Sequence, residues 1–163
     1  MPHINELYDF TVSAYIISPD KTKVLLLFHT KRNVWQQPGG HIELNEDIDT
    51  ALYREILEET GLSEDQLTIV DLGLKKPPLV RSYSQLTPFS IVVHPYDDST
   101  HQHIDLAYIF MSKTEELTKN PDGATAINWF TSNDIELLHK NKRLEKDTKS
   151  ICQNVLDQQA NSV

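Results

Sequence analysis

Alternating runs of hydrophobic and polar residues along the chain predict a set of β-strands. Residues 10–17 are rich in β-branched and aromatic side chains, and a Ser-Pro-Asp turn separates them from a second apolar run at residues 23–29. Two such runs about five residues apart predict a β-hairpin. The unbroken apolar centre of the second run indicates a strand that is covered on both faces.

The sequence predicts a helix that begins at residue 46 or 47 and ends at Thr60. Acidic residues suit the first turn of a helix, and Gly61 suits the position that follows the last turn. Apolar residues recur at the spacing of a helical turn and predict one core-facing stripe. They are Ile48, Leu52, Tyr53 and Ile56.

The remainder of the chain predicts further strands, followed by helices. Strands are expected at residues 66–75, 88–96, 103–111 and 127–130, and helices at residues 134–139 and 144–159. Ser132 is the expected cap of the first of these helices, and residues 30–38 are expected to form a polar loop. This order of elements predicts an α/β fold with a mixed β-sheet and helices packed against it.

Length and composition favour one soluble domain over residues 1–163, with 39% hydrophobic and 24% charged residues. The net charge of −9 argues against a non-specific nucleic-acid or anionic-membrane surface, so nucleic acid and membrane are not expected as partners. A single cysteine, no apolar stretch long enough to span a membrane and no recognisable signal peptide suggest a cytoplasmic location.

The predicted helix carries more acidic charge than its own folding requires. Glu55, Glu58 and Glu59 occupy positions i, i+3 and i+4, so their carboxylates share one face. Like charges at this spacing cost roughly 0.2–0.5 kcal/mol per pair. A hard divalent cation, in contrast, requires several carboxylate oxygens that converge on one point.

These glutamates belong to a longer pattern that begins at Gly40. Five residues separate Gly40 from Glu46, and seven more precede Arg-Glu-Ile-x-Glu-Glu-x-Gly-Leu, which ends at Leu62. Every fixed position of the Nudix box, GX5EX7REUXEEXGU with U a bulky aliphatic residue, is filled. The chain therefore resembles the Nudix hydrolases. The resemblance implies their α/β/α sandwich and hydrolysis of a pyrophosphate bond in a nucleoside diphosphate linked to another moiety, with Mg²⁺ or Mn²⁺.

The resemblance also implies roles for single residues. Glu55, Glu58 and Glu59 would be metal ligands, together with the backbone carbonyl of Gly39. Arg54 would hold a box glutamate by charge-assisted hydrogen bonds, although an ordinary surface ion pair is the alternative. Glu46 would support the start of the helix or serve an outer metal.

The general base is left open, because the family places it at variable positions. His101, His103 and Asp105 fall at i, i+2 and i+4, so on a strand they share one face. His103 or Asp105 could point at the metals as a base or an extra ligand, or this face could be a solvent-exposed edge. Asp105 is the better candidate as a hard oxygen ligand, and Glu58 is an alternative base.

Residues that select the substrate are less clearly marked. Trp35, Tyr83 and Phe89 could stack on a nucleobase, but a packing role is favoured for each. His41 stands where triphosphate-sanitising relatives often have lysine, which weakens that assignment.

Three functions follow in order of preference. The first is a metal-dependent hydrolase that acts on a small nucleotide or nucleotide sugar. A homodimer is a further expectation for this enzyme. The second is a non-catalytic nucleotide-sensing domain. The third, decapping of messenger RNA, is disfavoured by the acidic charge and by the lack of a basic, aromatic-rich region.

Overall fold

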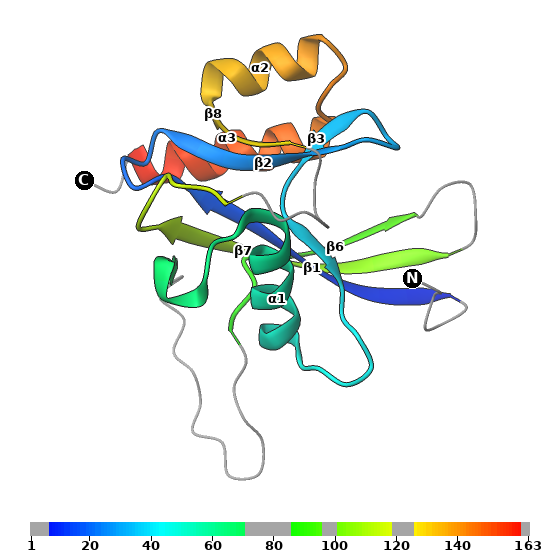
Figure 1. The fold of residues 1–163 in the computed structure, drawn as a ribbon. Helices are drawn as coiled ribbons and strands as arrows, with labels where there is room; N and C mark the ends of the chain where they lie inside the picture. The colour runs from blue at the N-terminus through cyan, green and yellow to red at the C-terminus, as the bar shows by residue number, and fades with distance from the viewer. Residues whose placement is uncertain (1–6, 71–85, 96–100, 119–125, 161–163) are drawn as a thin grey trace.

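A computed structural model describes residues 7–70, 86–95, 101–118 and 126–160, and its strands form one mixed sheet (Figure 1). The main strand order is β3-β2-β1-β7-β5, with β4 paired to β1, β6 to β7 and β8 to β2. The strands are β1 (Tyr8–Ile17), β2 (Lys23–His29), β3 (Val34–Gln36), β4 (Gly39–His41), β5 (Leu67–Ile69), β6 (Ser90–Pro95), β7 (Gln102–Ser112) and β8 (Ile127–Thr131).

The long strands β1 and β7 form the centre of the sheet. They run parallel, in register from the pair Tyr8 and Gln102 to the pair Ile17 and Met111. The predicted hairpin is confirmed, because β2 pairs with β1 in antiparallel orientation. The centre of β2 is buried on both faces, as its unbroken apolar sequence indicated.

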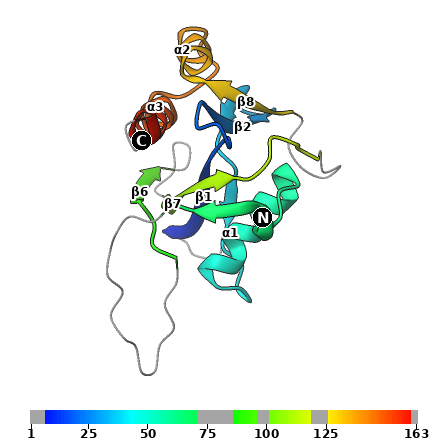
Figure 2. The same ribbon diagram turned by 90° about the vertical axis from the view of Figure 1, so that its left-hand side faces the viewer.

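Helices cover the two faces of the sheet, with α1 (Ile48–Thr60) on one face and α2 (Ser132–Lys140) and α3 (Lys146–Ala160) on the other (Figures 1 and 2). Each face has its own hydrophobic core. The α1 core includes Val12, Leu25, Leu52, Ile56, Tyr108 and Phe110, and the α2/α3 core includes Tyr15, Val24, Leu26, Ile109, Ile135 and Val155. The expected α/β fold with a mixed sheet is confirmed.

Helix α1 begins and ends where the sequence indicates. The Asp47 side chain accepts a hydrogen bond from the Thr50 amide at 2.8 Å, which satisfies one free donor of the first turn. Gly61 ends the helix in the left-handed conformation, with φ 76°. The box therefore starts at a tight strand, β4, and continues into a helix with well-defined ends.

Three local predictions are wrong or incomplete. Residues 30–38 are not simply a polar loop, because Val34–Gln36 forms β3 against β2. The cap of α2 is Thr131, not Ser132, since the Thr131 hydroxyl accepts a bond from the Asp134 amide. The strand expected over residues 66–75 is confirmed for Leu67–Ile69, and its last residues lie outside the described ranges.

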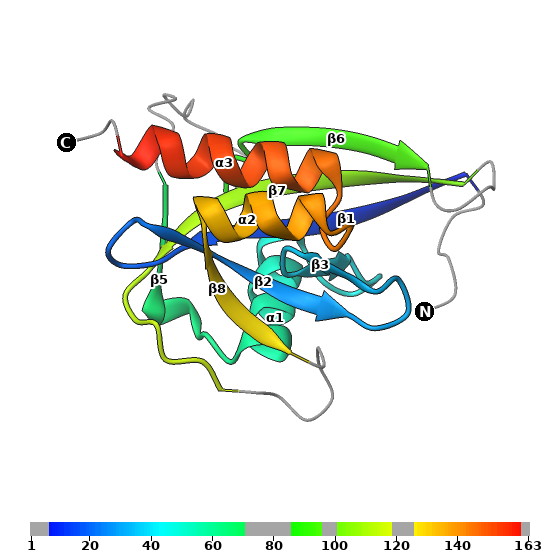
Figure 3. The same ribbon diagram turned by 90° about the horizontal axis from the view of Figure 1, so that it is seen from above.

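One end of the sheet extends beyond α2 and α3, and it is formed by β1, β6 and β7 (Figure 3). Phe10 on β1 and Ile91 and Val93 on β6 are exposed there. At the covered end, Cys152 of α3 is completely buried, and this burial raises the pKa of its thiol to about 12. In the part of the chain that the structure describes, no helix is long and apolar enough to cross a membrane.

Candidate functional site

The two glycines of β4 bring the start of the box against the carboxylates of α1. The Gly39 amide donates a hydrogen bond to Glu59 Oε2 at 2.9 Å. A Cβ atom on Gly40 would lie 2.3 Å from Glu55 Oε1, far inside contact distance. The missing side chain at Gly40 therefore makes the space that the Glu55 carboxylate occupies.

Arg54 is the centre of the charged group that surrounds this space. Its Nε and Nη2 atoms bind the two oxygens of Glu46 at 2.9 and 2.6 Å. Its Nη1 atom binds Glu55 at 2.8 Å and Glu58 at 3.3 Å. The bidentate pair with Arg54 lowers the pKa of Glu46. Arg54 thus contacts three carboxylates and is 23% exposed, unlike an isolated surface ion pair. We refer to Glu46, Arg54, Glu55, Glu58 and Glu59 as the box cluster.

The three helix carboxylates of the box cluster differ in their burial. The side chain of Glu58 is 54% exposed, whereas that of Glu55 is 13% exposed. Burial raises the pKa of Glu59 to about 8 and also raises that of Glu55, and the neighbouring carboxylates add to both shifts. A cluster of hard oxygen donors with excess negative charge, in a cradle that a Cβ would fill, fits a divalent cation such as Mg²⁺.

The polar face of β7 is buried and not a solvent-exposed edge. His101, His103 and Asp105 are 7%, 7% and 8% exposed. Both oxygens of Asp105 accept hydrogen bonds from hydroxyls of β1, from Thr11 Oγ1 at 2.8 Å and Ser13 Oγ at 2.6 Å. The even-numbered residues of β7 point to the α1 core, as the alternation predicted.

His103 and His41 meet on the sheet face that is opposite to α1. Their ring centroids are 4.9 Å apart, and burial, with the neighbouring histidines, lowers the pKa of His103 to about 4. Asp9 lies beside them, with its Oδ2 atom 3.7 Å from His41 Nε2 and 3.2 Å from His101 Nε2. We refer to Asp9, His41, His101 and His103 as the histidine cluster.

Sequence reasoning missed Asp9, which is 1% exposed. A signal was present in β1, where Asp9, Thr11 and Ser13 alternate with Phe10 and apolar residues. This alternation marks a polar face in an otherwise buried strand. The partners of that face become visible with the register, which pairs Asp9 with His103 and Thr11 with His41.

Comparison with known proteins is consistent with this geometry. The family model for the NUDIX domain matches residues 7–152. The chain belongs to the Nudix family. A solved NUDIX-family hydrolase from Clostridium perfringens has 29% sequence identity and a TM-score of 0.71, and the match covers 94% of this chain and 98% of that one. A Caenorhabditis elegans Ap4A hydrolase, at 15% identity and a TM-score of 0.69, shows the same fold over 93% of this chain and 98% of that one.

Curated relatives match this Nudix chain over shorter segments. The human m7GpppN-mRNA hydrolase NUDT17 is 28% identical over 135 residues, which cover 76% of this chain and 38% of that protein. An RNA pyrophosphohydrolase from Ruthia magnifica is 42% identical over 55 residues, 34% of this chain and 31% of that protein. The chain thus spans less than half the length of these two relatives.

Two of the proposed substrate residues of this Nudix chain are packed against other aromatic rings. Trp35 lies between Phe28 and Phe130, with ring centroids 5.4 and 4.7 Å away, and Phe89 contacts Tyr15 edge-on at 5.8 Å. Both residues thus have the packing contacts that the favoured role requires, and a stacking role stays a prediction. Tyr83 lies outside the described residues, and His41 belongs to the histidine cluster.

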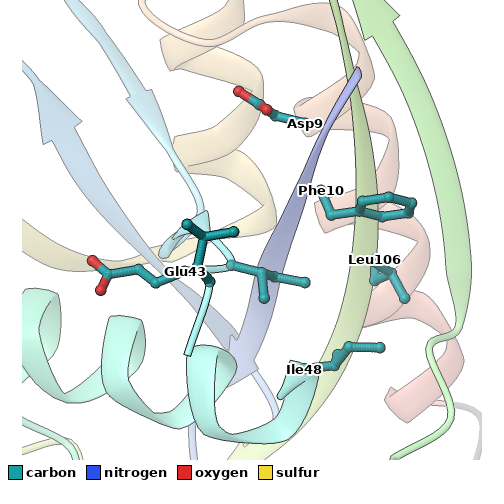
Figure 4. A pocket seen from close by; sticks show the side chains of 7 residues that line it. Asp9, Phe10, Glu43, Ile48 and Leu106 are labelled. Atoms are coloured by element: carbon teal, nitrogen blue, oxygen red, sulfur yellow. The ribbon is translucent and has the colours of Figure 1, made fainter. Parts of the chain in front are cut away.

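An apolar pocket of about 380 Å³ lies beside the loop that enters α1 (Figure 4). Its lining is mostly apolar and consists of Asp9, Phe10, Ile42, Glu43, Leu44, Ile48 and Leu106. The Glu43 carboxylate points away from Phe10 and Leu106. Figure 4 shows the Asp9 and Phe10 side chains on opposite sides of β1, and Asp9 belongs to both the pocket lining and the histidine cluster. The hydrocarbon walls suit an apolar group better than a phosphate.

Proposed function

We propose that this Nudix protein is a hydrolase that cleaves a pyrophosphate bond in a nucleoside diphosphate linked to another moiety. The observation that carries the proposal is the box cluster, in which Arg54 contacts Glu46, Glu55 and Glu58 and the Gly39 amide contacts Glu59. Glu55, Glu58, Glu59 and the Gly39 carbonyl would hold Mg²⁺ or Mn²⁺. When bound, such an ion neutralises charge on the pyrophosphate oxygens and lowers the pKa of a water ligand.

The residues of the chain prepare this site before any substrate binds. Arg54 fixes Glu46 and Glu55 through its planar guanidinium, so these carboxylates do not have to be ordered during the reaction. The Gly39 amide does the same for Glu59. Preorganised charge of this kind stabilises a transition state at little reorganisation cost.

We assign proton acceptance from the attacking water to Glu58, in preference to Asp105 and His103. Glu58 is half exposed and has a long contact to Arg54, so its carboxylate can reach water. Asp105 already accepts two hydroxyl hydrogen bonds, and His103 is packed within the histidine cluster. Matched rates for Asp105→Asn, His103→Gln and Glu58→Gln test the assignment, since the largest loss should follow Glu58.

RNA 5′ ends are a second substrate class, which the names of the curated relatives favour. One relative is named as an mRNA-cap hydrolase and others as RNA pyrophosphohydrolases. The acidic charge of this chain argues against non-specific binding along an RNA, but the 5′ end presents the same nucleoside polyphosphate as a free nucleotide. Both classes therefore belong in one substrate screen.

The test is hydrolysis, with product identification, of a panel incubated with Mg²⁺. The panel contains nucleotide sugars, dinucleoside polyphosphates, nucleoside triphosphates, 5′-triphosphate RNA and capped RNA. Glu58→Gln should lower the rate on the order of 10³-fold, while Glu64→Gln, a change at an exposed glutamate outside the box, should leave it unchanged. No turnover of any substrate, with wild type equal to Glu58→Gln, would sink the proposal, and tight nucleotide binding without turnover would favour the sensing domain. The expected homodimer and cytoplasmic location stay predictions.

A further inference from the structure

The projecting end of the sheet collects four side chains that can bind a metal on the face opposite to the box cluster. Asp9 comes from β1, His41 from β4 and His103 from the start of β7, and His101 directly precedes β7. The strand register makes them neighbours, because Asp9 pairs with His103 and Thr11 pairs with His41. Three strands, β1, β4 and β7, therefore fix the positions of Asp9, His41 and His103.

The ligand atoms in this group already converge. Asp9, His41 and His103 each offer one donor atom, and these three atoms all lie within 4.8 Å of one another. A tetrahedral ion with bonds of about 2.0–2.2 Å needs donor atoms separated by roughly 3.3 Å. The distance from Asp9 Oδ2 to His41 Nε2 is 3.7 Å, close to that separation, and His41 is the least buried of the three residues.

The chemistry of the donors differs from that of the box cluster. Two imidazole nitrogens and one carboxylate oxygen suit Zn²⁺ and similar transition metals, whereas Mg²⁺ prefers oxygen ligands alone. His101 Nε2 is 3.2 Å from the same Asp9 oxygen that approaches His41. Such a contact orients a ligating carboxylate in many metal sites.

We propose that Asp9, His41 and His103 form a second metal site, for Zn²⁺ or a similar divalent transition metal, with a fourth position left for water. His101 supports the Asp9 carboxylate from outside the ligand set. This site does not depend on the proposed hydrolase activity. It is connected to the box cluster through the His41 carbonyl, which accepts a hydrogen bond from Arg54 Nη2 at 3.0 Å.

The experiment measures Zn²⁺ binding to tag-free, chelator-treated protein by competition with a chromophoric chelator, in the presence of excess Mg²⁺. One equivalent of Zn²⁺ should bind and should persist in Glu58→Gln, which alters the box cluster only. His103→Ala and His41→Ala should each weaken Zn²⁺ binding by at least about 100-fold. His29→Ala on β2, a histidine outside the cluster, is the matched control and should bind as wild type does.

Co²⁺ gives a second measurement, because an ion held by two histidines and a carboxylate has a visible absorption band that changes with its ligands. That band should appear at one equivalent and be lost in His41→Ala, a change at a partly exposed position. Absence of Zn²⁺ binding in excess Mg²⁺ overturns the proposal. Binding that is unchanged in both His41→Ala and His103→Ala overturns it as well. Loss of Zn²⁺ binding in Glu58→Gln would place the ion in the box cluster instead.

Discussion

The box cluster and the histidine cluster lie on opposite faces of β4, and they hold their charges in different ways. In the box cluster, one guanidinium is shared by three glutamates, and the carboxylates outnumber it. In the histidine cluster, one buried carboxylate lies among imidazoles. Adjacent residues of one short strand, Gly40 and His41, thus serve two sites with different chemistry. The box cluster suits a hard cation, and the histidine cluster suits a softer one.

Of the changes that compare the two clusters, Gly40→Ala should give the largest effect after Glu58→Gln, and its effect should fall on the box cluster only. The new Cβ would overlap the Glu55 carboxylate and displace it, while Arg54 still holds Glu46. A misplacement of this kind costs on the order of 10²-fold in activity. Steady-state hydrolysis measures the loss, and Zn²⁺ binding should stay within threefold of wild type, a margin of about 0.65 kcal/mol. Equal loss of hydrolysis and Zn²⁺ binding would contradict the separation of the two clusters.

Arg54→Ala should follow in size, because it removes the shared cation from the box cluster. Truncating one partner of a buried ion pair costs about 3–5 kcal/mol, and the partial exposure of Arg54 reduces this to about 2 kcal/mol of unfolding free energy. Urea denaturation measures the change. Arg54→Lys keeps the charge but loses the two-pronged contact with Glu46, so it should recover only part of the stability.

With rising pH, the two clusters should change the free energy of unfolding in opposite directions. The pKa of Glu59 is raised to about 8, so metal-free protein should lose stability as the pH rises from about 4.5 to 8. The pKa of His103 is lowered to about 4, so its contribution rises between about pH 4 and 6.5. Above pH 6.5 the His103 contribution is complete, so the raised pKa of Glu59, together with that of Glu55, should lower stability by about 1 kcal/mol.

Thermal melting at pH 6.5 and pH 8 tests this sign. Glu59→Gln should remove most of the loss of stability over that interval. Added Mg²⁺ should stabilise the wild type more at pH 8, because a cation competes with the proton for the carboxylate. A fall in melting temperature that persists in Glu59→Gln would assign the titration to another group.

The smallest effect is expected for His103→Ala assayed in Mg²⁺ alone. If the histidine cluster is not part of the hydrolytic machinery, the rate should change by less than about threefold, or roughly 0.65 kcal/mol of activation free energy. A loss of two orders of magnitude would return His103 to the role of base that its sequence position suggested. Circular dichroism of the variant controls for folding.

The sequence predicted those parts of the fold whose signals lie within one short segment of the chain. Helix α1 could be placed because Asp47 and Gly61 mark its ends and its apolar stripe repeats with each turn. The β1–β2 hairpin could be placed for a similar reason, since two apolar runs flank one turn. The carboxylates of the box followed from their spacing on the helix.

The histidine cluster could not be predicted in this way, because its geometry depends on strand register. Asp9 and His103 are far apart in the sequence and meet only because β1 and β7 run parallel in one particular alignment. A shift by one residue would move His103 to the α1 core. The short strand β4, which supplies His41, has no alternating pattern of its own, so its pairing with β1 comes from the tertiary fold.

Cys152 gives the protein an internal reporter of its own opening. Its thiol lies on the core-facing side of α3, is fully buried and stays protonated at neutral pH, because burial raises its pKa to about 12. A thiol reagent can therefore react only during the moments when this helix separates from the sheet. With a single cysteine in the chain, the labelling rate measures the free energy of that separation without any added probe.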